Sequence, residues 1–156
     1  MLSRKAKYAL RALAVLTRAY PDRVPAKRLA REAAVPGKFL EAILVELRNA
    51  QVVASKRGTD GGHTLARPAE EVMVGDIVRI LDGPIAPIRC ASVTAYKPCA
   101  DCPEPDRCAL RLLMGDVRNA MSGVIDRRSL RQLSDDTWRL ASTAGLPGNA
   151  VEESRA

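Results

Sequence analysis

Aromatic side chains are scarce in this chain. Only 3% of its 156 residues are Phe, Trp or Tyr, although 47% are hydrophobic, so a core must be built mostly from Leu, Val, Ile and Ala. No run approaches the roughly 20 apolar residues that span a bilayer, and residues 1–7 lack the apolar segment of a signal peptide. The sequence therefore predicts a cytoplasmic protein with no membrane partner, built as one domain or as a small domain with a helical arm.

Cysteine is absent outside one short segment. Four thiols, Cys90, Cys99, Cys102 and Cys108, lie among prolines and acidic residues rather than in an apolar run. In a reducing cytosol such a cluster favours a metal or redox role over structural disulfides. The CxxC spacing of Cys99 and Cys102 can direct two sulfurs at one metal. An iron–sulfur cluster, a zinc site and a thiol–disulfide switch remain open, although four-thiolate zinc sites usually use two CxxC pairs.

Residue sets typical of enzymes are also missing. The chain has one histidine, His63, and neither a P-loop nor a GxGxxG motif. A redox-active CxxC begins a helix after a strand, whereas this one lies in a Pro-rich segment. We therefore predict that the protein is not an enzyme, with a CxxC thiol oxidoreductase as a remote alternative. His63 falls on a predicted strand, where a structural or DNA-backbone role is favoured over metal ligation.

Positive charge is abundant in the first half of the chain. Residues 1–70 carry 14 Lys and Arg against 6 Asp and Glu, a net charge of +8. Residues 71–156 carry 11 against 12, a net charge of −1. This asymmetry is typical of a module that binds nucleic acid, although a solvated basic face would give the same count.

The spacing of apolar residues predicts a winged helix-turn-helix. Helices are expected over 3–20, from Pro25 onward, over about 38–48 and over 72–81. Strands at 52–57 and 63–66 flank a Gly-rich turn at 58–62 and predict a β-hairpin wing after the second helix of the motif. The third helix is expected to turn five apolar side chains inward: Phe39, Leu40, Ile43, Leu44 and Leu47. The predicted fold class is mainly α with this small β-hairpin.

A long helix is expected over about 106–126, with a broad apolar stripe. Its members recur at steps of three and four: Leu110, Leu113, Val117, Met121 and Val124. One small domain has little room to bury such a stripe, so we interpret it as a homodimer seam. The alternative is a helix folded back on its own domain. A short helix over 129–140 follows, and the chain from Gly145 is expected to be disordered.

In a winged helix, the second helix of the motif enters the major groove of double-stranded DNA, and the wing lies along the backbone or minor groove. Lys38 can reach phosphate or guanine, and Glu41 can accept from a cytosine amino group, although Glu41 can equally be a solvated carboxylate. Arg57 suits insertion into a narrow minor groove. Glycines let the wing tip turn with positive φ and approach DNA closely: Gly58, Gly61 and Gly62. Phosphate contacts are predicted for Arg4, Lys5, Lys7, Lys27, Arg28 and Lys56.

Four motifs in order resemble the BadM/Rrf-type (IscR/NsrR/RirA-like) family of bacterial transcriptional regulators over roughly residues 1–140. They are Ser3-Arg-Lys-Ala-Lys-Tyr-Ala-Leu, Phe39-Leu-Glu-Ala-Ile-Leu, Arg57-Gly-x-x-Gly-Gly and Gly75-Asp-Ile-Val-Arg-Ile-Leu-Asp-Gly-Pro. The resemblance implies a homodimer whose long helices pair, with a cluster-binding loop between the DNA-binding part and the dimer helix. It also implies that Glu41 reads a base and that Arg57 enters the minor groove.

The cysteines match the family's pattern in part. Cluster-binding members carry three cysteines and one non-cysteine ligand, and the resemblance assigns Cys90, Cys102 and Cys108 to the three. The position that supplies a histidine ligand in one branch of the family is Arg111 here, and no carboxylate stands near Tyr8, where other members have an acidic ligand. We therefore hypothesise that Cys99 is the fourth ligand of a 2Fe–2S or 4Fe–4S cluster.

These observations predict four regions. Residues 1–84 form the winged helix-turn-helix, 85–107 the cysteine-rich cluster loop, 108–140 the dimerisation helix with the short terminal helix, and 141–156 a disordered tail. The predicted function is a homodimeric, DNA-binding transcriptional regulator that senses redox, iron or nitric-oxide status through the cluster. The alternative keeps the DNA binding and replaces the cluster with a metal-free thiol switch or a zinc site.

Overall fold

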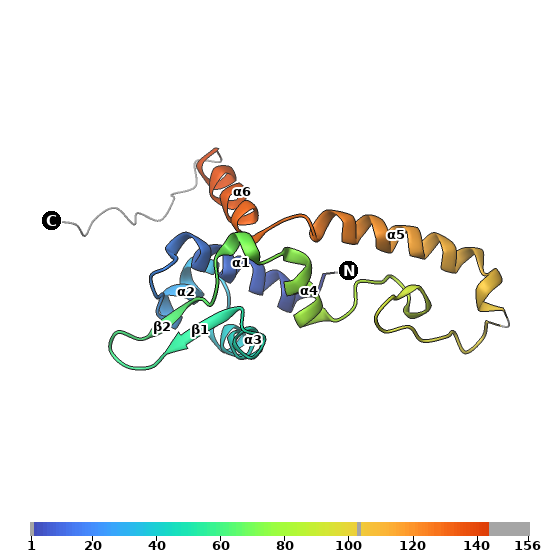
Figure 1. Cartoon of the computed structure of the whole chain (residues 1–156). Helices are drawn as coiled ribbons and strands as arrows, with labels where there is room; N and C mark the ends of the chain where they lie inside the picture. The colour runs from blue at the N-terminus through green and yellow to red at the C-terminus, as the bar shows by residue number, and fades with distance from the viewer. Residues whose placement is uncertain (1, 103, 144–156) are drawn as a thin grey trace.

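The computed structural model describes residues 2–102 and 104–143. Within these residues, helices and one antiparallel hairpin follow one another along the chain (Figure 1). Their order is α1 (Arg4–Ala19), α2 (Ala26–Ala33), α3 (Gly37–Asn49), β1 (Val53–Lys56), β2 (Gly62–Leu65), η1 (Ala69–Glu71), α4 (Val74–Asp82), η2 (Arg89–Ala91), η3 (Pro105–Arg107), α5 (Ala109–Ile125) and α6 (Leu130–Thr143). The predicted fold class, mainly helical with a small hairpin wing, is confirmed.

The first three helices begin and end where local chemistry requires. Ser3 caps α1, because its hydroxyl accepts a hydrogen bond from the amide of Ala6, which satisfies one of the free donors at a helix start. Pro25 and Pro36 directly precede α2 and α3. Ala34 ends α2 in the left-handed conformation, and its amide donates to carbonyls of the last turn. The tight connection between α2 and α3 is that of a helix-turn-helix.

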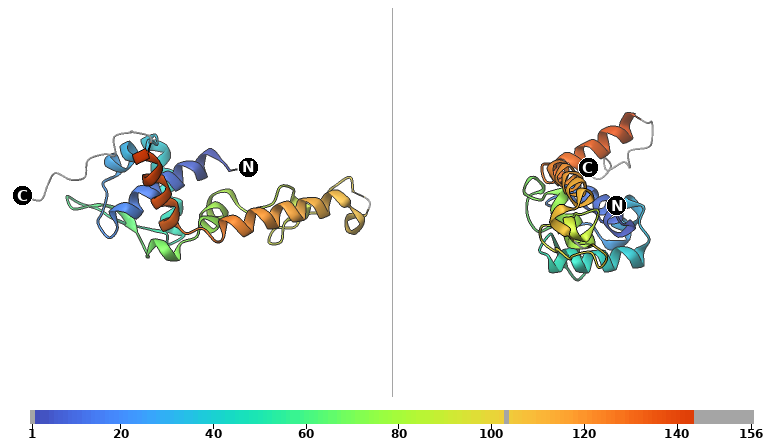
Figure 2. Two further views of the ribbon diagram at one scale, coloured as in Figure 1. Left: turned by 90° about the horizontal axis from the view of Figure 1, so that it is seen from above. Right: turned by 90° about the vertical axis from the view of Figure 1, so that its right-hand side faces the viewer.

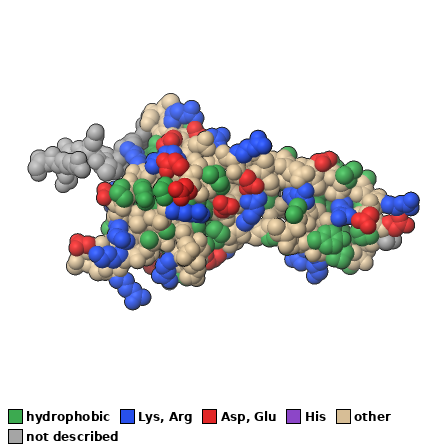
Figure 3. Space-filling view, viewed as in Figure 1, with side chains coloured by type: hydrophobic (Ala, Val, Ile, Leu, Met, Phe, Trp, Pro, Cys, Tyr) green, Lys and Arg blue, Asp and Glu red, His purple; other side chains and the backbone are tan. Residues whose placement is uncertain are grey.

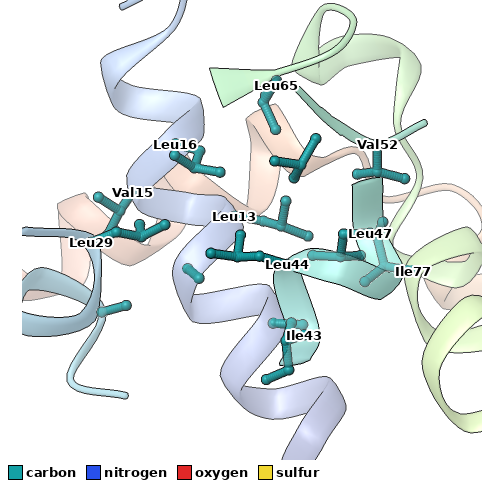
Figure 4. Packing of buried hydrophobic residues seen from close by; sticks show 14 of the residues in the cluster. Leu13, Val15, Leu16, Leu29, Ile43, Leu44, Leu47, Val52, Leu65 and Ile77 are labelled. Atoms are coloured by element: carbon teal, nitrogen blue, oxygen red, sulfur yellow. The ribbon is translucent and has the colours of Figure 1, made fainter. Parts of the chain in front are cut away.

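The core lies among α1, α3, α4 and the hairpin (Figure 4). Leucine and isoleucine side chains from these elements meet there, and the fully buried ones include Leu13, Leu16, Leu40, Ile43, Leu47 and Ile77. Alanines on α1 are also fully buried, at Ala6, Ala9 and Ala12. Their small side chains let neighbouring helices approach α1 closely. The core is aliphatic, as the scarcity of aromatic residues predicted.

The hairpin pairs Val53 with Leu65 at its base and Lys56 with Gly62 near its tip. Gly58 and Gly62 adopt positive φ, as predicted. Gly61 does not, so the prediction was wrong for that residue. A Cβ on Gly61 would lie 2.6 Å from the carbonyl oxygen of Lys56, so the close approach of the backbone requires glycine there instead.

Two regions are distinct in space (Figures 1 and 2). We call α1–α4, the hairpin and α6 the head, and residues 85–125 the arm. In the arm, α5 projects from the head and the cysteine-containing segment runs alongside it. The segment's buried residues are Cys90, Ala91 and Ser92. None of the residues of α5, all of which the structure describes, is buried.

The chain returns from the arm to the head through α6. Its Leu130 is fully buried, and Ser134 donates a hydrogen bond to the carbonyl of Ala14 at 3.0 Å. Just before α6, the backbone pairs with the segment around the start of α4, where the Val74 amide donates to Arg128 and the Leu130 amide to Val72. Backbone pairing and side-chain packing thus fix the chain to the head directly after the C-terminal end of α5.

Most predicted elements occur within a few residues of their expected bounds. One inward-facing residue was wrong: Phe39 is 50% exposed and contacts Tyr8 edge to face, with ring centroids 5.9 Å apart. It lies about 100° around α3 from Leu40, outside the buried stripe. The predicted disordered tail was wrong for residues 141–143, which are helical as the end of α6, and the rest of it lies outside the described residues. No helix of the described chain is long and apolar enough to cross a membrane.

Candidate DNA-binding face and cysteine site

The outward face of α3 carries the predicted base-reading residues. Lys38 and Glu41 are both exposed in the first half of the helix. The opposite face is anchored in the core by Leu40, Ile43, Leu44 and Leu47, all buried. Because a helix repeats every 3.6 residues, this anchoring orients Lys38 and Glu41 away from the protein. The structure therefore presents them on one exposed surface, as a groove-binding helix requires.

The wing lies beside this helix. Arg57 is exposed directly after β1, at the turn that contains Gly58. Basic side chains gather at the tip of the hairpin, at the lower left of the space-filling view (Figure 3). His63 bonds across the hairpin, with its Nδ1 2.8 Å from the Ser55 hydroxyl, and partial burial followed by the charge of Arg48 lowers the pKa of His63. This cross-strand contact ties β2 to β1 within the wing.

The predicted phosphate contacts divide into two groups. Two of them are already engaged within the protein: Lys5 pairs with Glu46 at 3.0 Å and Arg28 with Glu32 at 2.6 Å. The other four are exposed, and they are Arg4, Lys7, Lys27 and Lys56. An engaged cation must exchange partners to reach phosphate, so the four exposed residues are the stronger candidates.

The four thiols lie in one neighbourhood beside the start of α5. Cys90 is buried in η2, Cys99 is exposed, and Cys102 and Cys108 are partly buried. The Cys99 thiol donates to the Cys90 sulfur at 3.5 Å. This hydrogen bond, with smaller effects of burial and nearby groups, raises the pKa of Cys99. Burial, followed by Cys108, raises the pKa of Cys102.

Arg111 holds this neighbourhood together. Its Nε donates to the Cys90 carbonyl at 3.0 Å, and its Nη1 donates to the Pro105 carbonyl and to the Asp106 carboxylate. The guanidinium also lies 5.3 Å from the ring centroid of Tyr96. These bonds fasten α5 to segments on both sides of the CxxC pair. Arg111 is therefore engaged by the backbone and side chains of the thiol segment.

A second arginine acts in the same way about two turns further along α5. Arg118 donates to the Ala91 carbonyl at 2.6 Å and to the side chain of Asn119. Between the two arginines, η2 and α5 enclose an open hollow of about 300 Å³, whose lining includes Cys90 and Cys108. We call these two arginine contacts the latches of the thiol segment. Sequence patterns did not predict them, because the residues around a helical arginine do not indicate which distant backbone carbonyl it will bind.

The thiols fit an iron–sulfur cluster by chemistry. Four neighbouring cysteines are the ligand set that such clusters use, and Arg111 supplies positive charge near the anionic site that they would form. In the described residues, however, no three His, Cys, Asp or Glu side chains converge as a preformed metal site. The ligand set is present in the sequence and gathered by the fold, whereas the final convergence of the sulfurs would accompany binding.

The features of the head define a class. A tight helix-turn-helix, a second helix with one face in the core and the other exposed, and a hairpin wing directly after it are the parts of a winged-helix DNA-binding protein. Comparison with known proteins gives the particular family. The family model described as Rrf2, iron-dependent transcriptional regulator, matches residues 2–136. The chain belongs to the Rrf2 family of transcriptional regulators, as its motifs predicted.

Individual relatives agree with this assignment. A putative HTH-type transcriptional regulator, rrf2-like, from Rhodobacter capsulatus is 39% identical over 137 residues, which cover 85% of this chain and 91% of that protein. The solved structure of CymR, the global cysteine regulator of B. subtilis, matches with a TM-score of 0.72 and 30% identity over 87% of this chain and 97% of CymR. The IscR structure from T. potens matches with a TM-score of 0.69 and 26% identity, covering 88% of each chain.

Proposed function

We propose that this transcriptional regulator acts as a homodimer that binds double-stranded DNA and senses redox, iron or nitric-oxide status through an iron–sulfur cluster. The ligands are Cys90, Cys99, Cys102 and Cys108. The observation that carries the proposal is that Arg111 makes structural hydrogen bonds while a fourth thiol lies beside the other cysteines. Arg111 is used to fasten the site, and an additional thiol, Cys99, lies 3.5 Å from the sulfur of Cys90.

The DNA-binding part of the proposal is supported by exposure and charge. Lys38 and Glu41 face solvent on a helix whose other face is in the core, and they read base edges in the major groove. Arg57 enters the adjacent minor groove, and the wing glycines Gly58, Gly61 and Gly62 bring the backbone close to DNA. The exposed cations supply the sequence-independent attraction to phosphates.

The homodimer is supported by the surface of α5. Apolar side chains remain exposed along this helix, at Leu110, Leu112, Leu113, Val117, Met121 and Val124. The four turns of apolar surface end at Asp126, which is fixed to the head by a bidentate ion pair with Arg79 at 2.7 and 2.8 Å. A second copy covers this stripe and relates two recognition helices by a two-fold axis, the geometry that palindromic operators need.

The sensing role follows from how the residues connect the two regions. A bound cluster supplies an electron- and nitric-oxide-reactive centre. The four thiolates hold it, the buried η2 segment anchors one ligand, and Arg111 and Arg118 carry the position of η2 to α5. A change of the site regulates transcription only if its two states differ in DNA affinity. A change at the thiol site would move α5, and the Asp126–Arg79 ion pair would pass this movement on to the head.

The test is purification without oxygen. We expect a brown protein with the visible absorption of thiolate–iron bonds and with iron and sulfide in equal amounts. Cys99→Ala is expected to reduce bound iron strongly, whereas the control Thr94→Ala, in the exposed part of the same segment, keeps it. A colourless protein after anaerobic reconstitution with iron and sulfide would overturn the cluster assignment, and a fully loaded Cys99→Ala protein would overturn the role of Cys99.

A thiol–disulfide switch is the second candidate, favoured by the short distance between Cys90 and Cys99. Two sulfurs 3.5 Å apart need a small movement to reach the bond length of about 2.05 Å. Peroxide would take two electrons from the two thiols, which release two protons and join, while the peroxide becomes two waters. Peptide mapping after oxidation of the metal-free protein distinguishes a Cys90–Cys99 bond from one between Cys99 and Cys102. Tight zinc binding instead would indicate the third option, a four-thiolate zinc site.

The domain limits also remain a proposal. We place the DNA-binding domain at 1–84, the cluster loop at 85–107 and the dimerisation and terminal helices at 108–140. The pairing of α6 with α1 means that the terminal helix contributes to the stability of the first domain. A fragment ending at residue 84 should therefore be less stable than the full chain, which limited proteolysis and thermal melting can measure.

A further inference from the structure

The outward face of α3 has an apolar centre. Val45 is 46% exposed, although it lies in the middle of a helix in which Leu44 and Leu47 are buried. Ala42, one turn earlier, is exposed too. With Lys38 they stand at positions i, i+4 and i+7, which form one line along a helix surface. This line is opposite the buried stripe of α3, so a molecule bound to the exposed face of the helix would contact Val45 directly.

Folding of a single chain uses only part of this valine's apolar surface. A β-branched residue on an exposed helix face loses rotamer freedom that a straight-chain residue keeps. Almost half of its surface stays in water, so burial within the chain leaves a large part of the side chain without an apolar partner. By contrast, the neighbouring outward positions hold Lys38, Glu41 and Arg48, which suit a solvated face. The exposed valine is therefore better explained by what the face binds.

We propose that Val45, with Ala42 beside it, contacts 5-methyl groups of thymine in the major groove and so determines part of the sequence specificity. The inference rests on the proposed DNA binding. The thymine methyl is the apolar feature that a T·A pair presents in that groove, and small apolar side chains recognise it. Because both side chains are short, they leave Glu41 free to accept from a cytosine amino group. A binding site therefore contains thymine adjacent to the cytosine that Glu41 contacts.

The experiment begins with the full-length protein and a library of random duplex DNA. Binding sequences are selected without oxygen, and the best duplex is then synthesised with each thymine replaced in turn by deoxyuridine, which lacks only the 5-methyl group. We expect one or two positions per half-site to weaken binding about fourfold, the factor for one buried methyl group. In Val45→Ala the same replacements should change affinity less than about twofold. Alanine favours helix, so this variant should fold.

Matched controls separate the outcomes. Val93→Ala removes the same two methyl groups from an exposed valine in the arm and should retain the full sensitivity to deoxyuridine. Selected duplexes that bind tightly but tolerate every replacement would overturn the inference while leaving DNA binding intact. Undiminished sensitivity in Val45→Ala would overturn it as well. Failure to bind or enrich any duplex, with or without an intact thiol site, would instead refute the proposed function.

Discussion

In the head, most leucines, isoleucines and valines of α1, α3 and α4 are buried against one another, whereas in the arm none of those of α5 is buried. Both regions are helical and both carry regular apolar spacing. The head has several elements that converge on one interior, and the arm has one long helix with a short irregular segment beside it. A regular apolar repeat predicts that one face of a helix is packed against something. When the same chain offers no further element to pack against that face, another molecule must cover it.

The comparison assigns different tasks to the two regions. The head owes its stability to its own core, so its surface is available for DNA. In the arm, hydrogen bonds from Arg111 and Arg118 hold the thiol segment to α5, and the apolar side of α5 remains open.

The largest effect should come from the core of the head. Leu13→Ala removes a fully buried side chain from the centre of α1 and should lower the free energy of unfolding by about 3 kcal/mol. Urea denaturation followed by circular dichroism measures the change. The matched variant Leu112→Ala, at a side chain 72% exposed on α5, should cost much less in dilute protein. Equal losses for both variants would contradict the division into head and arm.

The next effect concerns the proposed dimer. Leu113→Glu places a carboxylate on the apolar stripe of α5 and should raise the Kd of the homodimer about 30-fold, because the charge would be buried without a partner. Sedimentation equilibrium gives the constant, and melting of the monomer checks that the head remains folded. The control Leu140→Glu changes a leucine on α6 that is also more than half exposed. If it weakens the dimer as much as Leu113→Glu, the seam is not on α5.

A smaller effect is expected at the latch of the thiol segment. Arg111→Ala removes the hydrogen bonds from this side chain to the Cys90 and Pro105 carbonyls. If the proposed iron–sulfur cluster is bound, its visible absorption should decay in air about fivefold faster, because a lost hydrogen bond is worth about 1 kcal/mol. Arg107→Ala is the control, because this exposed arginine pairs with Glu104 on the same turn. Identical lifetimes for the wild type and Arg111→Ala would show that the latch does not protect the site.

The smallest effect should appear where arm and head join. The Arg79 guanidinium lowers the pKa of Asp126 below its ordinary value of 3.8. The pair's stabilisation is therefore present above about pH 4 and lost as the pH falls through the lower, folded pKa. Both side chains are more than a third exposed, so Asp126→Asn should cost about 0.5 kcal/mol at pH 7. The difference from wild type, measured by denaturation, should shrink toward pH 2; a constant difference would contradict the ion pair.

Gly75 offers a second way to disturb the same junction. A Cβ at this position would overlap a carboxylate oxygen of Asp126 and lie 2.8 Å from Arg79 Nη1. This requirement accounts for glycine inside a short helix, where it is otherwise unfavourable. The sequence motif at Gly75 supported the family resemblance, but only the tertiary structure reveals why the position excludes a side chain.

Sequence patterns predicted the helices, the hairpin and the family because each depends on neighbours in the chain. Ser3 marks a cap and the apolar repeat of α3 marks a buried face, and both are local signals. Phe39 failed because one helical step separates it from the buried Leu40, and residue type alone does not resolve that angle. The four thiols could be recognised as a site, whereas the contact of Cys90 with Cys99 depends on how the intervening segment folds.

By itself, the sequence determined an aliphatic winged helix with a basic first half, a cysteine-bearing segment and an apolar long helix. Local spacing and charge are sufficient for these features. The three-dimensional packing is needed to see that Arg111 holds the thiol segment, that Gly75 makes room for the Arg79–Asp126 pair and that Val45 stands exposed at the centre of the outward face of α3. Each of these depends on the distance or angle between side chains brought together by packing, which a linear pattern does not encode.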